Sequence, residues 1–169
     1  MTNIAIGQGD ILVTPLQMAC VYAGIANGGK EYVPHVFLSA VSRDGEGDAV
    51  TYKPKERLKG DFEKESHLNL VRDGLKGVIY EESSDQASHF TSLSTTVAGK
   101  SGTGQKTNED DYSWFVVYAP YDDPKYVIAS LVEEGGYGAT ASLYAVRDVL
   151  GAIYGEPDTV GTTAGDGAR

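Results

Sequence analysis

The chain has 169 residues and is 41% hydrophobic, which suffices for one ordinary globular domain with an apolar core. Acidic residues outnumber basic ones by 24 to 14, and this net charge of −10 argues against a nucleic-acid partner, because few cations are present to neutralise phosphates. The single cysteine, Cys20, leaves no internal disulfide or cysteine-based zinc site, and the 3 histidines are isolated, so neither a metal nor a cofactor is predicted.

The first predicted element is a helix over residues 14–27. Thr14 supplies a hydroxyl N-cap, and Pro15 takes the first helical position, where a missing N–H costs nothing. Small and apolar side chains then recur at spacings of three and four residues, at Leu16, Ala19, Ala23 and Ala26. The Asn-Gly-Gly run at 27–29 accepts the left-handed backbone of a helix end, so it is expected to terminate the helix.

Two short strands are predicted next, over residues 32–41 and 49–52, and Asp44-Gly45 between them is a candidate hairpin turn. Pro34 has no N–H to donate, which predicts an edge position for the first strand. The charged stretch 53–65 is expected to be a solvated connector.

A second helix is predicted over residues 66–81, with Ser66 as its N-cap. Its apolar side chains form one stripe, which consists of Leu68, Val71, Leu75, Val78 and Ile79. The residues that follow, 81–93, are rich in Ser, Glu and Asp and predict a loop.

Three strands are predicted after this loop, over residues 95–102, 113–119 and 126–133. The second and third are apolar on both faces, so other elements should cover both sides of the sheet. A last helix over residues 139–154 is amphipathic and suited to lie across the sheet, whereas 155–169 holds too few apolar residues to pack and is expected to be disordered. The predicted fold class is α/β, of the α+β type, over residues 1–154, with helices covering an antiparallel sheet.

The most informative stretch is Gly99-Lys100-Ser101-Gly102-Thr103, for which three interpretations compete. A nucleotide-binding P-loop would need a glycine where Ser94 stands and a helix directly after the lysine and serine, so this interpretation fails. The second interpretation is a glycine-rich edge strand with a merely solvated lysine, because four-residue motifs often match by chance. The third is the Lys-Ser-Gly strand of a serine acyltransferase that binds β-lactams.

The flanking residues decide between these interpretations. Blocks at 6–9, 13–19, 26–29, 71–78, 97–103 and 114–120 follow one order and spacing. With these blocks the chain resembles class B penicillin-binding proteins from about residue 4 to residue 154. The resemblance implies a partial penicillin-binding-protein and serine β-lactamase-like transpeptidase fold, in a family of peptidoglycan D,D-transpeptidases.

The resemblance also implies a role for each residue of the strand. Lys100 supplies a cation, and the side chains of Ser101 and Thr103 supply hydroxyl groups, for the terminal carboxylate of a D-Ala-D-Ala peptide or of a bound β-lactam. The backbone N–H of Thr103 is expected to be one of two oxyanion-hole donors. Gly102 lets an acyl group approach the strand backbone, and Gln105 is a candidate contact for the substrate amide.

Three other residues of the matching blocks are assigned no ligand. Gln8 and Gln17 are interpreted as structural. Trp114 is expected to belong to the core, because an indole on a strand buried on both sides usually packs.

Two motifs of the family are missing from this sequence. No serine has a lysine at the third following position, and no asparagine has a serine two residues before it. We therefore expect a fragment that begins inside the transpeptidase domain, is inactive alone and lacks the N-terminal half of the same domain. Such a fragment exposes apolar surface and is expected to self-associate. Membrane attachment is expected only through an upstream anchor, on the extracytoplasmic face of a bacterial cell membrane.

The predicted function is the substrate- and β-lactam-binding half of a peptidoglycan D,D-transpeptidase, which cross-links stem peptides in cell-wall synthesis. Two alternatives stay open: a non-catalytic peptide- or partner-binding module of the cell-wall machinery, and part of a serine β-lactamase. The blocks within 8–19 and 114–120 favour penicillin-binding proteins over the hydrolase.

Overall fold

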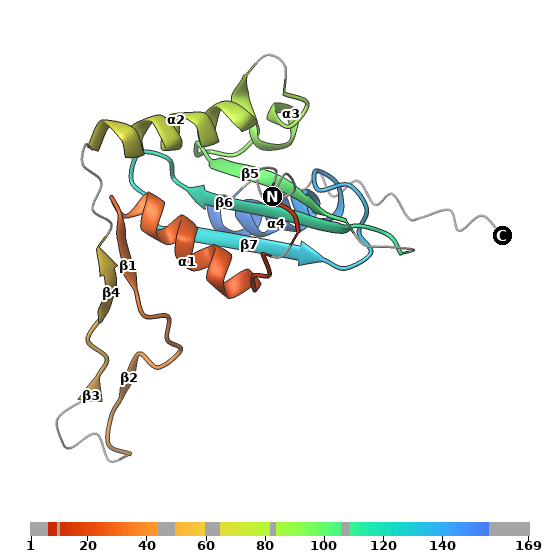
Figure 1. Ribbon diagram of the computed structural model, residues 1–169. Coiled ribbons are helices and arrows are strands. Elements are labelled where there is room, and N and C mark those ends of the chain that lie inside the picture. The colour runs from red at the N-terminus through yellow and green to blue at the C-terminus, as the bar shows by residue number, and fades with distance from the viewer. Residues whose placement is uncertain are drawn as a thin grey trace.

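A three-stranded antiparallel sheet forms the centre of the molecule (Figure 1). Its strands are β5 (Ala98–Gly104), β6 (Tyr112–Ala119) and β7 (Tyr126–Val132), in that spatial order. The computed structural model describes residues 7–9, 11–43, 50–59, 65–81, 84–105 and 109–155. The three predicted strands are confirmed, although β5 begins and ends later than expected.

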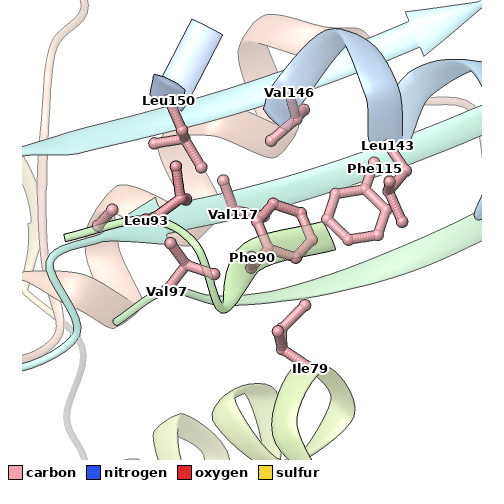
Figure 2. Packing of buried hydrophobic residues seen from close by; sticks show 10 residues of the cluster. Ile79, Phe90, Leu93, Val97, Phe115, Val117, Leu143, Val146 and Leu150 are labelled. Carbon is pink, nitrogen blue, oxygen red and sulfur yellow. The ribbon is translucent and has the colours of Figure 1, made fainter. Parts of the chain in front are cut away.

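Helices cover both faces of this sheet, as predicted. Helix α1 (Pro15–Ala26) lies on one face and helix α4 (Ala141–Tyr154) on the other (Figure 1). Figure 2 shows the core on the α4 side, where the aromatic ring of Phe90 stacks on that of Phe115 with centroids 5.9 Å apart. A second cluster lies on the α1 side and includes Tyr22 and Tyr118. Two-sided burial explains why β6 is apolar at nearly every position.

The start of α1 follows from its first residues. The Thr14 hydroxyl accepts from the Gln17 N–H at 3.2 Å, and the Gln17 side chain accepts from the Thr14 N–H at 2.8 Å. This reciprocal pair is a capping box, so the structural interpretation of Gln17 holds. Gly28 and Gly29 follow the helix with φ of 68° and 90°, the left-handed backbone expected at its end.

Helix α2 (Glu65–Tyr80) packs along the outer side of β5 (Figure 1). It begins at Glu65, so the predicted capping role of Ser66 is wrong, since this residue already lies in the first turn. The predicted loop over 81–93 is also partly wrong. It contains the short helix α3 (Ala87–Phe90), which places Phe90 in the core with no exposed surface.

A narrow ribbon projects away from the sheet and consists of two two-stranded pieces (Figure 1). Strand β1 (Lys30–Tyr32) pairs with β4 (Glu56–Lys59), and β2 (Ser39–Ala40) pairs with β3 (Val50–Thr51). The single strand predicted over 32–41 is therefore interrupted, at Pro34, which cannot donate to a ladder. The supposed connector over 53–65 supplies β4, so that prediction is wrong for this part of it.

Two predictions fall outside the described residues. These are the turn at Asp44-Gly45 and the disordered tail, of which only Gly155 is described, as the left-handed cap of α4.

Candidate functional site

Strand β5 divides the predicted site residues between its two faces. Side chains alternate along a strand, and Val97 packs in the cluster on the α4 side while Ala98 packs on the α1 side. Lys100 therefore extends on the α1 side, together with the open position at Gly102. Ser101 and Thr103 extend on the α4 side, so the cation and the two hydroxyl groups flank one strand edge.

Among the described residues, no strand pairs with that edge of β5. Strand β6 occupies the other edge, with Thr103 opposite Ser113 in the register. The carbonyl oxygen of Ser101 accepts from the Lys100 Nζ at 2.9 Å, and that of Thr103 accepts from the Gln8 Nε2 at 3.4 Å. Both carbonyl groups thus point away from β6. The N–H of a residue in an extended strand points to the same side as its carbonyl, so the Thr103 N–H also points away from β6.

A cavity of about 460 Å³ lies beside this edge. All five predicted site residues line it, namely Lys100, Ser101, Gly102, Thr103 and Gln105. Gln8 and Trp114 also line it, together with Tyr22 from α1. The structure therefore brings the predicted residues together.

Trp114 and Gln8 line the cavity and also contact neighbouring parts of the structure. Trp114 packs against the cluster on the α1 side, as expected, and also lines the cavity, so it is not a core residue alone. Gln8 has the structural role predicted for it, because it bonds to the strand at Thr103. Burial of the Tyr22 hydroxyl raises the pKa of this side chain to about 12, so it stays protonated and neutral at physiological pH.

A loop between β7 and α4 holds the strand on the α4 side. The N–H of Gly138 donates to the Thr103 Oγ1 at 2.9 Å. A Cβ at Gly138 would lie 2.1 Å from the carbonyl oxygen of Gly102, so only glycine fits this approach. Sequence reasoning missed this residue. The signal was the cluster of three glycines within residues 135–138, which follows two glutamates at the end of a strand apolar on both faces.

The chemistry open to this arrangement is recognition of an extended, anionic peptide end. A strand edge offers N–H groups to an extended peptide, and hydroxyl groups beside a cation suit a carboxylate. Within the described ranges, no group of three His, Cys, Asp or Glu side chains could hold a metal ion. In the same ranges no helix has the length and hydropathy needed to cross a bilayer.

Comparison with known proteins places the chain in a family. The model of the penicillin binding protein transpeptidase domain matches residues 1–153. The chain therefore belongs to the penicillin-binding-protein transpeptidase family, as the sequence predicted. Among curated relatives, peptidoglycan D,D-transpeptidase MrdA of Haemophilus influenzae is 30% identical over 165 residues, which are 88% of this chain and 25% of the relative. Peptidoglycan D,D-transpeptidase PbpA of Mycolicibacterium smegmatis is also 30% identical, over 87% of this chain and 29% of the relative.

Solved structures agree with this assignment. The imipenem acyl-enzyme complex of penicillin-binding protein A from M. tuberculosis matches with a TM-score of 0.74 and 25% identity, over 89% of this chain and 33% of that one. The D,D-transpeptidase domain of a peptidoglycan glycosyltransferase from Eggerthella lenta matches with a TM-score of 0.67 and 31% identity, over 85% and 33% of the two chains. The chain thus spans about a quarter to a third of the proteins that it matches.

Proposed function

We propose that this chain forms the substrate- and β-lactam-binding wall of a peptidoglycan D,D-transpeptidase, whose nucleophilic serine is supplied by residues outside this sequence. One observation carries the proposal: the Thr103 N–H points away from β6, at a strand edge that Lys100 and Ser101 flank and that borders the cavity. The M. tuberculosis relative is an imipenem acyl-enzyme complex, so a β-lactam is covalently attached in a protein of this fold.

The proposed reaction has two acyl transfers. The serine oxygen attacks the penultimate D-Ala carbonyl, and the terminal D-Ala leaves as an amine that takes up a proton. An amine of a neighbouring stem peptide then takes the acyl group and releases the serine. The Thr103 N–H stabilises the oxyanion of each step, and donors of this kind contribute about a hundredfold or more in rate. Lys100 and the hydroxyl groups of Ser101 and Thr103 hold the terminal carboxylate of the donor peptide.

The rest of the sheet is proposed to come from the same protein. The outer side of β7 borders a groove of about 420 Å³, which is lined by Pro15 of the α1 face and by Ala145 and Val149 of α4. An added strand would extend the sheet there and cover this apolar surface. Since the parent would act on peptidoglycan, we place it on the extracytoplasmic face of a bacterial membrane, held by an anchor outside this sequence.

A covalent labelling experiment tests the proposed function. This chain alone, and a protein that joins it to upstream residues carrying Ser-x-x-Lys, are incubated with fluorescent penicillin and then denatured. We expect label on the longer protein only. Lys100→Ala should slow labelling of the longer protein by about tenfold or more, because a charged contact to the ligand carboxylate is lost. Lys125→Ala is the matched control, since this exposed lysine pairs with Asp123 in the β6–β7 turn.

Each other outcome contradicts part of the proposal. Label on the chain alone would show that the nucleophile lies within this sequence. Equal labelling of the Lys100→Ala and Lys125→Ala variants would remove Lys100 from the site. A longer protein that never takes up label would favour the non-catalytic binding module, and rapid turnover of the bound penicillin would favour the β-lactamase.

A further inference from the structure

Two buried serines lie behind the site residues and bond to each other. Ser113 of β6 and Ser142 of α4 have no exposed surface, and their hydroxyl oxygens are 2.7 Å apart. The Ser142 N–H also donates to the Ser113 Oγ at 3.2 Å. Burying a hydroxyl is unfavourable unless it finds partners, so each of these two groups is expected to be hydrogen-bonded.

Both hydroxyl groups reach backbone carbonyl groups of the same loop, and the Ser113 Oγ lies 3.2 Å from the carbonyl oxygen of Tyr137. The carbonyl oxygen of Gly138 accepts from the Ser142 Oγ at 2.9 Å and lies 3.3 Å from the Ser113 Oγ. The N–H of the same glycine donates to the Thr103 Oγ1. Gly138 is therefore held by the serine pair through its carbonyl group and holds Thr103 through its N–H.

This chain of bonds constrains the hydroxyl group of Thr103. A hydroxyl has one hydrogen to donate and two lone pairs that accept. Because the Gly138 N–H occupies a lone pair of the Thr103 Oγ1, the hydroxyl hydrogen must point away from the loop. A hydroxyl that already accepts a hydrogen bond is also a stronger donor. The half-buried Thr103 can then direct this donor toward a ligand at the strand edge.

We propose that Ser113 and Ser142 are positioning residues, which act through Gly138 to orient the Thr103 hydroxyl as a donor to the ligand carboxylate. This inference rests on the proposed function, because it assumes a ligand with a C-terminal carboxylate. One hydrogen of the serine pair lies between the two hydroxyl oxygens, and the other is donated to the loop carbonyl, which fixes a glycine loop otherwise free to shift.

The test compares two ligands that differ only in the carboxylate. The ¹⁵N-labelled full chain is titrated with N-acetyl-D-Ala-D-Ala and with its C-terminal carboxamide, and shifts of the Gly102, Thr103 and Gly138 amide signals report binding. The wild-type chain should prefer the carboxylate. Substitution of both serines, S113A with S142A, should lower this preference by about tenfold or more, the loss expected for one hydrogen bond to a charged group. Thr103→Val should lower it as much, while Thr103→Ser should retain it.

Two further variants separate positioning from a general loss of structure. Ser142→Ala alone leaves Ser113 beside the Gly138 carbonyl and should lower the preference for the carboxylate less. This single variant provides the test if the double variant does not fold. Ser88→Ala removes an exposed hydroxyl on α3 and should change nothing. If the wild-type chain binds neither ligand, the proposed function fails, and this inference fails with it. If the wild-type chain prefers the carboxylate and the folded serine variants keep that preference, the inference alone is overturned.

Discussion

Substitution of Gly138 by alanine provides the sharpest test of how the β7–α4 loop meets strand β5. The new Cβ would lie 2.1 Å from the Gly102 carbonyl oxygen, whereas ordinary contact begins at 3.4 Å. The obstructing atom belongs to the backbone, so the clash cannot be relieved by rotating a flexible side chain, and the loop itself must move. Overpacking of this kind costs about 1–3 kcal/mol. The displaced loop also loses its hydrogen bond to Thr103, worth about 1 kcal/mol, so Gly138→Ala should lower the free energy of unfolding by about 2–4 kcal/mol.

Urea unfolding followed by the fluorescence of Trp114, the single tryptophan, measures this change. Gly74→Ala is the matched control, because a Cβ at this exposed position in α2 meets nothing within 4 Å. Replacing a glycine inside a helix should raise the free energy of unfolding by about 0.5–1 kcal/mol. A Gly138→Ala variant within about 0.5 kcal/mol of the wild type would refute the tight approach of the loop to the strand.

Two further predictions concern the folded chain in solution. Burial raises the pKa of Tyr22 to about 12 from its ordinary 10.0, so the unfolded chain releases this proton first and the free energy of unfolding should fall as the pH rises from 10 toward 12. Tyr22→Phe should remove the part of this slope that corresponds to one proton, in denaturation measured across this pH range. An unchanged slope would contradict the assignment. The apolar groove beside β7 should also let the chain self-associate, and light scattering should show a mass above 18.0 kDa that Val149→Lys lowers. Val36→Lys on the ribbon is the control, and a strictly monomeric wild type at high concentration would rule self-association out.

Local sequence signals predicted the elements whose causes are local. Helix α1 begins and ends where Thr14 and the glycines at 28–29 indicate, because a cap and a left-handed turn depend on a few adjacent residues. Strand β4 was missed because its charged residues resemble a solvated segment. It is a strand only because it pairs with β1, where Arg57 also forms an ion pair with Glu31. Strand β1 is distant in sequence, so residues near β4 do not indicate this pairing.

Burial in a polar context was equally hard to predict. Phe90 lies in a stretch rich in Ser, Asp and Glu, so its surroundings indicated a loop. The structure instead turns this single aromatic residue into the core, against Phe115. One residue has no periodicity, and only the tertiary packing shows which way it faces.

The candidate site shows the same division between local and distant causes. The tetrapeptide from Lys100 to Thr103 could be found in the sequence, because the residue types match a carboxylate ligand. The contacts that hold the tetrapeptide in place could not be found in the same way, since one comes from a segment far before it and the other from a segment after it. Gln8 bonds to the Thr103 carbonyl across 95 residues, and Gly138 bonds to its side chain across 35.

Thr103 is therefore constrained in two directions, which leaves its N–H and its hydroxyl hydrogen for a ligand. Gln8 occupies the carbonyl group at the strand edge, and Gly138 occupies a lone pair of the hydroxyl oxygen. A substitution at either contact should thus weaken ligand binding without changing any residue of the tetrapeptide. It follows that the same four residues in another strand would not reproduce this site, because the direction of each donor depends on the two flanking segments rather than on the motif.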